Sequence, residues 1–151
     1  MADGLTTDPA AELSELLAVD SIATLIHRYD LRPGAAPSTT VNIVRTVDDH
    51  LDVLVLCDSR VIIFDTAGQI HQIRDDRLAQ VSQRLRPRGG LKHLPPAELA
   101  ALIESYEAMR NHYDGFWCVS ATANTARQAV YRQFPAAEVH VSLAMTGPSD
   151  R

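Results

Sequence analysis

The strongest structural signal in the sequence is the stretch Leu51-Asp52-Val53-Leu54-Val55-Leu56-Cys57-Asp58-Ser59-Arg60-Val61-Ile62-Ile63-Phe64. It holds the densest set of β-branched and aliphatic residues in the chain, and such residues suit a pleated, buried surface. Its two apolar runs are short and separated by a polar segment, which favours strands over helices. Gly68 in the next turn tolerates a positive φ, so the chain is expected to return as a third strand over 69–73. The stretch therefore predicts an antiparallel meander.

The segment before the meander predicts a helical region followed by a strand. Apolar residues recur at helical spacing over 10–29, where Asp20-Ser21 either caps a second helix or marks a shift of face within one helix. Arg32-Pro33-Gly34 ends the helical region, because Pro cannot continue the hydrogen-bond ladder. The alternation over 39–45 is typical of a half-buried strand.

The segment after the meander mixes predicted helices and strands. Residues 78–85 have the spacing of a short helix, and Pro95-Pro96 opens an amphipathic helix that runs to residue 109. The core stripe of this helix is predicted to be Leu99, Leu102, Ile103, Tyr106 and Met109. A strand, a helix and a last strand are expected at 116–119, 125–134 and 139–145. This order predicts an α+β fold, with antiparallel sheets flanked by helices.

Composition and charge narrow the class of protein. The 151 residues, 46 % of them hydrophobic, are typical of one globular domain. The formal net charge of −5 argues against nucleic-acid and anionic-membrane partners, which need a basic patch. Neither a signal peptide nor an apolar run of roughly 18 residues is present, so a cytoplasmic location is expected. Cys57 and Cys118 lie in apolar runs and are expected to be buried thiols.

One local group of cations departs from this acidic background. Arg84, Arg86, Arg88 and Lys92 surround Gly89-Gly90 in a segment rich in loop-forming residues. The group is either a solvated loop or a binding loop for a partner.

Familiar catalytic motifs do not account for the remaining polar residues. The six histidines are scattered without helical i, i+4 pairing, and neither a phosphate-binding loop nor a serine-hydrolase elbow is present. Asp58 stands out because a carboxylate at the end of a buried strand is costly unless it meets a cation, a metal or backbone donors. Arg60 is close in sequence, and Asp52 precedes the same strand.

The segment Leu54–Phe64, with Gly68 at the next turn, resembles the Gly-Asp-Ser-Arg hairpin of the metal-dependent type-2C Ser/Thr protein phosphatases. Other pieces occur in the order of that family: a segment rich in small and hydroxyl residues, an acidic turn, and two later segments, at 37–41, 75–78, 115–119 and 146–147. The resemblance implies a four-layer sandwich, in which two antiparallel sheets pack face to face between helices. It also implies two Mn²⁺ or Mg²⁺ ions that generate a hydroxide for attack on a phosphoryl group. Asp58 matches the motif aspartate, which lies beside the metals, and Ser59 and Arg60 match its neighbours.

The sequence departs from the family pattern where most metal ligands should stand. The early Asp-Gly strand is missing, and Asp3-Gly4 and Asp114-Gly115 are coincidental pairs in the leader and in a turn. Thr146-Gly147 lacks the carboxylate of the family's Thr-Asp-Gly, and the final Asp-Asn ligand is also missing. Cys57 replaces the motif glycine. A dinuclear site needs several converging oxygen ligands, so Asp58 is the one metal ligand predicted here.

The prediction is an incomplete type-2C-phosphatase-like domain over 10–147, between a leader at 1–9 and a tail at 148–151. It is expected to be weakly active or inactive, with Mn²⁺ or Mg²⁺ as cofactor if active and a phosphoprotein or other protein as partner. Missing core elements would expose sheet edges, so self-association is expected. Two alternatives stay open: a non-catalytic, phosphatase-derived binding module, or a small structural α+β protein in which Asp58 and Arg60 pair.

Overall fold

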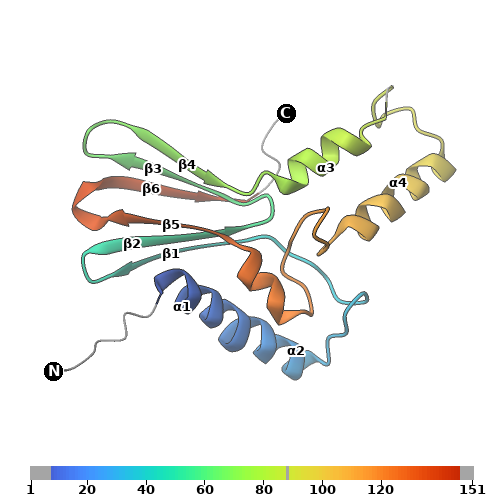
Figure 1. The fold of residues 1–151 in the computed structure, drawn as a ribbon. Helices are drawn as coiled ribbons and strands as arrows, with labels where there is room; N and C mark the ends of the chain where they lie inside the picture. The colour runs from blue at the N-terminus through green and yellow to red at the C-terminus, as the bar shows by residue number, and fades with distance from the viewer. Residues whose placement is uncertain (1–7, 88, 147–151) are drawn as a thin grey trace.

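A computed structural model of the chain describes residues 8–87 and 89–146. Its centre is a pair of three-stranded antiparallel sheets (Figure 1). One sheet has the order β1-β2-β5, with strands Val41–Val47, His50–Leu56 and Val130–Pro135. The other has the order β4-β3-β6, with strands Ile70–Arg74, Arg60–Asp65 and Val139–Met145. An α+β fold with antiparallel sheets is therefore confirmed.

The expected meander is wrong at its first turn. β2 and β3 do not pair with each other but form the central strands of opposite sheets. The chain crosses between the sheets at 57–59, where Cys57 has a positive φ of 69°. The turn from β3 to β4 is a hairpin as predicted, with Gly68 at φ 78°. β2 is buried on both faces, between the helical segment and the other sheet, whereas β3 is fully buried only on the face that points toward β2.

The two sheets pack face to face through the alternate residues of their central strands. Val53 and Val55 of β2 meet Val61 and Ile63 of β3, and all four side chains are fully buried. Ile73 of β4 joins them. Removing these apolar side chains from water stabilises the packing of the two sheets, by roughly 25 cal/mol for each Å² of apolar surface buried.

A helical segment covers the outer face of the β1-β2-β5 sheet. It consists of three consecutive parts without a break: α1 (Pro9–Glu15), the π-helical η1 (Leu16–Ala23) and α2 (Thr24–Tyr29). Of the two arrangements that the sequence allowed for this region, the structure therefore has the single continuous helix and not two separate helices. Asp8 caps its start by accepting a hydrogen bond from the Ala10 N–H at 3.0 Å. Its buried side chains pack against Leu54 of β2 and Ala126; they are Leu13, Leu17, Ala18 and Ile22.

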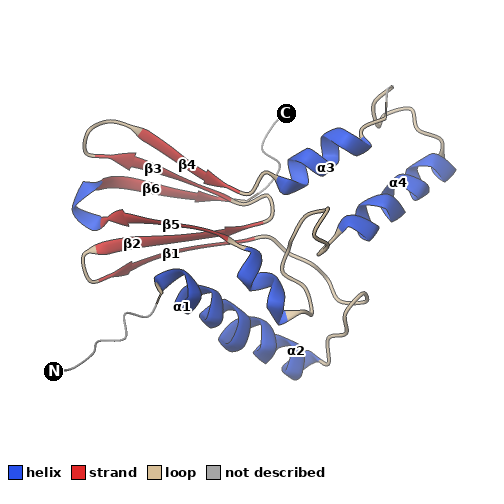
Figure 2. Ribbon diagram, in the orientation of Figure 1, coloured by secondary structure: helices blue, strands red, loops and turns tan. Residues whose placement is uncertain are grey.

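The described residues thus form three layers: helix, sheet and sheet (Figure 2). Figure 2 shows the helical layer on one side of the sandwich and the β4-β3-β6 sheet as the outermost layer on the other. None of the helices within 8–87 and 89–146 has the length and apolar character needed to cross a membrane.

Helices α3 (Arg77–Leu85) and α4 (Pro96–Met109) lie beyond one end of the sheets (Figure 1). Both helices occur where they were predicted. Val81 of α3 packs with Cys57, Phe116 and Cys118, and Tyr106 and Met109 of α4 lie against this cluster. The prediction that the remaining apolar residues of α4 belong to the core is wrong, since the side chains of Leu99 and Ile103 are 42 % and 54 % exposed. The helix is anchored through its C-terminal turn, and the described residues place no sheet against its other turns.

Two further predictions are wrong. Residues 125–134 are not a helix: a 3₁₀ helix, η2 (Ala123–Gln128), leads into β5, where Val130, Tyr131 and Phe134 suit a strand and pair with β2. Residues 116–119 form two isolated bridges, Arg110 with Phe116 and Thr39 with Val119, and no strand. A short 3₁₀ turn, η3 (Ala136–Glu138), joins β5 to β6, which matches the predicted last strand. β1 begins two residues after the predicted strand start.

Candidate functional site

The tip of the β2–β3 connection borders a cavity of about 360 Å³. The other walls come from the end of β4 and the exposed side of α3. The charged lining residues are Asp58, Arg60, Arg74, Asp75, Asp76 and Arg86. The structure therefore brings the Asp58-Ser59-Arg60 turn and the acidic Asp75-Asp76 turn, which the sequence singled out separately, to one place.

Ser59 holds the turn in shape. Its side chain is 1 % exposed, and its hydroxyl oxygen lies 2.5 Å from that of Thr40. Thr40 in turn donates to the carbonyl oxygen of Leu56 at 3.0 Å, which leaves Ser59 as the donor to Thr40. These bonds satisfy polar groups that burial would otherwise leave unpaired. The supporting role predicted for Ser59 is structural: it fixes the backbone on which Asp58 stands.

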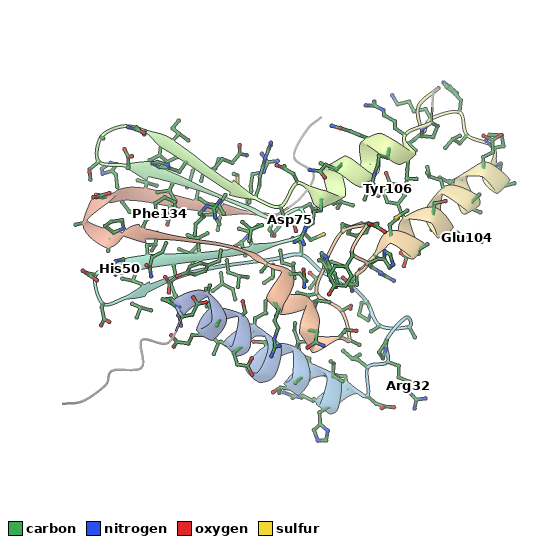
Figure 3. The ribbon with its side chains drawn as sticks, viewed as in Figure 1. Arg32, His50, Asp75, Glu104, Tyr106 and Phe134 are labelled. Atoms are coloured by element: carbon green, nitrogen blue, oxygen red, sulfur yellow. The ribbon has the colours of Figure 1, made fainter. Side chains whose placement is uncertain are left out.

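Asp75, labelled in Figure 3 between β4 and α3, lines the cavity and ties three segments together. Its two oxygens accept hydrogen bonds from Arg77 Nε and Nη2 at 2.8 and 2.7 Å, and Oδ1 also accepts from the Arg77 backbone N–H at 3.1 Å. The backbone N–H of Cys57 points at Oδ2 from 3.4 Å, and Arg77 Nη2 continues to the carbonyl of Gln128 at 2.5 Å. This bidentate pair fixes the β2–β3 turn, the start of α3 and η2 relative to one another.

Asp58 and Arg60 are both half-buried at the rim of the cavity. The pairing of Asp58 with Arg60, which belongs to the structural alternative, is not observed: within 8–87 and 89–146 neither residue has an ion-pair partner within 4.0 Å. The partial exposure explains how an unpaired carboxylate is tolerated there, because water still solvates it. The fully buried carboxylate of this strand is Asp52 instead.

The residues around Asp58 do not fit a metal pair. Asp75 is saturated by Arg77, and Asp76 Oδ1 accepts from Arg74 Nε at 2.8 Å. In the part of the chain that the structure describes, no group of three or more His, Cys, Asp or Glu side chains is arranged to hold a metal ion. Hard divalent cations need several oxygen ligands free to converge. Asp58 alone is left for that task, so the predicted metal role of Asp58 stays a prediction.

The cationic residues at 84–92 do not form one binding loop, because those that the structure describes have different contacts. Arg84 lies in α3 and donates to the carbonyl of Asp114 at 2.8 Å, so it anchors the helix. Arg86 and Lys92 line a second cavity, of about 870 Å³, beside Tyr106 of α4. Arg86 lines both cavities. Arg88 lies outside the described residues. Arg86 thus lines the same cavity as Asp58 and Arg60, which the sequence did not predict.

Sequence reasoning missed the main buried polar cluster, which is centred on Asp52 of β2. Arg45 and Gln133 are the direct cross-strand neighbours of Asp52 on β1 and β5, and both donate to its carboxylate, at 3.0 and 2.9 Å. Tyr131 donates to Oδ1 at 2.5 Å. Burial opposes ionisation, yet these three donors outweigh it and lower the pKa of Asp52. The available signal was an aspartate inside an otherwise apolar strand.

The two cysteines are free and buried, as predicted. The neighbouring Cys118 thiol and the loss of water together raise the pKa of Cys57 above its ordinary range. The same contact lowers the pKa of Cys118, but both thiols are buried, so the pair lacks the exposure of a reactive nucleophile and is a packing contact.

The cavity as a whole is a polar recess with charges of both signs. Asp58, Arg60 and Arg86 are its members without an ion pair among the described residues, while Arg74, Asp75 and Asp76 are held in pairs. Such a recess can bind a polar group through charge-assisted hydrogen bonds. Comparison of the chain with protein-family models, curated proteins and solved structures gives no match.

Proposed function

We propose that this chain is a type-2C-phosphatase-like domain that binds a protein partner at the Asp58 cavity and has lost metal-dependent phosphoester hydrolysis. One observation carries the proposal: the two segments that resemble the family's Asp-Ser-Arg and acidic turns line the same cavity. The face-to-face antiparallel sheets support the same reading. The four-layer sandwich of the family would add a second helical layer, over the outer face of the β4-β3-β6 sheet.

The carboxylates of Asp75 and Asp76, which line the cavity, are engaged in ion pairs, and this favours a binding role over metal-dependent hydrolysis. Generating a hydroxide at neutral pH needs metal ions held by several ligands. Asp75 and Asp76 are instead neutralised by Arg77 and Arg74. What the cavity retains is a set of hydrogen-bonding groups on a rigid turn.

The chemistry of the rim suggests the kind of partner. The guanidinium groups of Arg60 and Arg86 suit a phosphate group on serine or threonine, or a carboxylate. Asp58 suits a basic or hydroxyl group next to it. A phosphorylated peptide segment carrying a basic residue combines both features.

Hydrolysis is tested with p-nitrophenyl phosphate and Mn²⁺, comparing the wild-type chain with Asp58→Ala. We expect no Mn²⁺-dependent turnover above that of Asp58→Ala. The control is Asp49→Ala, because the Asp49 side chain is 87 % exposed in the β1–β2 turn. Turnover that is lost in Asp58→Ala and kept in Asp49→Ala would show a working metal site.

Binding is tested by NMR titration of the ¹⁵N-labelled chain with a phosphothreonine peptide that carries an arginine. Shifts should be confined to the 57–60 and 74–86 segments, and Arg60→Ala combined with Arg86→Ala should weaken binding about tenfold or more, as expected for charge-assisted contacts. Arg32→Ala, at a side chain 77 % exposed in a loop outside the cavity, should change nothing. Equal weakening by Arg32→Ala would indicate unspecific charge attraction, and no binding at all would leave a small structural α+β protein.

A further inference from the structure

Strand β6 is the end strand of its sheet, and its side chains are exposed on both faces. Val141, Leu143 and Met145, on the outer face, are 41 %, 46 % and 38 % exposed. Ser142 and Ala144, on the face that points toward the other sheet, are exposed as well. An uncovered sheet face would expose one set only, whereas exposure of both sets is what a missing neighbouring strand produces.

The strand also lacks the features that normally protect a sheet edge. Natural edge strands carry charged side chains, proline or bulges that discourage pairing. Val139–Met145 contains no proline, lysine, arginine or carboxylate, although the chain as a whole has a net charge of −5. The irregularity in its pairing with β3 lies at Phe64/Asp65, at the start of β6. Asn42 reaches the carbonyl of Met145 at the other end. The centre of the strand, around Ser142, stays accessible.

We propose that β6 pairs antiparallel with β6 of a second copy of this chain, about a two-fold axis at Ser142. This register keeps like faces together over 140–144, whereas at its ends the inner Val139 meets the outer Met145, because the pairing of β6 with β3 is irregular between Val139 and Val141. On the outer face Val141 lies opposite Leu143 of the second copy, and Leu143 opposite its Val141. On the inner face Ser142 meets Ser142, and His140 meets Ala144. Val141 and Leu143 thus each face an apolar residue on the same side of the sheet, and the two sheets join into one.

Charge favours a second copy as the occupant. The free edge of the sheet has a cationic end, where Arg60 of β3 lies opposite Met145, and an acidic end, where the exposed Glu138 directly precedes Val139. A two-fold axis that reverses the strand direction brings the cationic end of one copy to the side of the acidic end of the other. The central part of the pair carries no formal charge, so acidic chains meet there without repulsion.

The first test is sedimentation velocity of the full chain over a range of concentrations. We expect a concentration-dependent dimer for the wild type and a monomer for Val141→Lys combined with Leu143→Lys. These positions are exposed, so circular dichroism should show an unchanged fold. The matched control is Ile70→Lys, at a 65 % exposed position on β4, the opposite edge of the same sheet. Ile70→Lys should remain a dimer.

The register is tested by oxidative cross-linking of Ser142→Cys. Directly opposed residues in an antiparallel pair have Cβ atoms about 4.5–5.5 Å apart, close enough for a disulfide after small adjustment. We expect a disulfide-linked dimer for Ser142→Cys and none for Gln72→Cys, an exposed position on β4. A monomeric wild type, a dimer that survives the double lysine variant, loss of the dimer in Ile70→Lys, or equal cross-linking of Gln72→Cys would each overturn the proposal.

Discussion

Tyr131 donates its hydroxyl hydrogen to Asp52 Oδ1 at 2.5 Å, and so joins β5 to the centre of β2 on the helix-covered face of the sheet. Asp52 is 1 % exposed, and its remaining acceptor capacity is filled by Arg45 and Gln133. Arg45 also reaches Glu12 of α1 at 3.4 Å. One buried carboxylate therefore connects three strands and the helix that covers them.

Asp52→Ala should lower the free energy of unfolding by about 2–4 kcal/mol, because it leaves the Arg45 charge and two polar groups without their partner. Tyr131→Phe, which removes one donor, should cost about 1–2 kcal/mol. Urea denaturation measures both, with Asp49→Ala as the exposed aspartate control. If Asp52→Ala unfolds at the same urea concentration as Asp49→Ala, the cluster contributes nothing to stability.

Acid should destabilise the protein through the same residue. The pKa of Asp52 is lowered in the folded chain, so the folded state binds its proton less readily than the unfolded state. The stabilisation is fully present above the ordinary aspartate pKa and is lost as the pH falls through the folded value. Unfolding free energies measured from pH 6 down to pH 2.5 should fall more steeply for the wild type than for Asp52→Asn. Parallel curves would contradict a lowered pKa.

Gly115 is expected to tolerate no side chain. A Cβ atom at Gly115 would lie 1.8 Å from the carbonyl oxygen of Met109, the same oxygen that accepts from the Phe116 N–H at 3.1 Å. Gly115→Ala must therefore break this turn and displace Phe116 from its buried cluster, at a cost of about 2 kcal/mol or more. Gly89→Ala is the matched control, since nothing lies within 4 Å of its added Cβ. Thermal unfolding should separate the two variants clearly, and equal melting temperatures would refute the geometry at Gly115.

Leu13 of α1 and Leu99 of α4 should differ sharply in their contribution to the free energy of unfolding. Leu13 of α1 is fully buried, so Leu13→Ala should cost about 2–5 kcal/mol through lost burial and the cavity left behind. Leu99 of α4 is 42 % exposed, so Leu99→Ala should cost less than about 1 kcal/mol. Chemical denaturation of the two variants measures the loss in the free energy of unfolding for each. A large loss for Leu99→Ala would restore the core stripe that the sequence predicted for α4.

The helices that the sequence predicted correctly are those with strong local signals. Pro95-Pro96 and the spacing of Leu78, Val81 and Leu85 were enough to place α4 and α3. The contacts of α4 could not be predicted in the same way, because an apolar stripe shows that a helix can be buried and not what lies opposite it. The structure packs only the C-terminal turn of α4.

The candidate site was predicted in pieces. The Asp58-Ser59-Arg60 turn and the acidic turn at Asp75-Asp76 were visible as unusual polar residues next to apolar runs. Their common cavity depends on the crossing of the chain from β2 to β3 and on the position of α3. The bonds from the Cys57 N–H to Asp75 and from Arg77 to the Gln128 carbonyl link segments that local patterns treat as independent.

The sequence by itself determined the α+β class, the apolar runs that become β2 and β3, the β3–β4 hairpin and the last strand, because alternation, turn residues and β-branched composition are local properties. Only the tertiary structure decided that β2 and β3 belong to different sheets, that 130–135 is a strand beside β2, and that Asp52 rather than Asp58 is the buried carboxylate. The physical reason is that sheet pairing joins residues far apart in the chain. The backbone groups of β2 need partners on both sides, and β5, which supplies the partner on one side, lies far along the chain in a segment that was predicted as a helix.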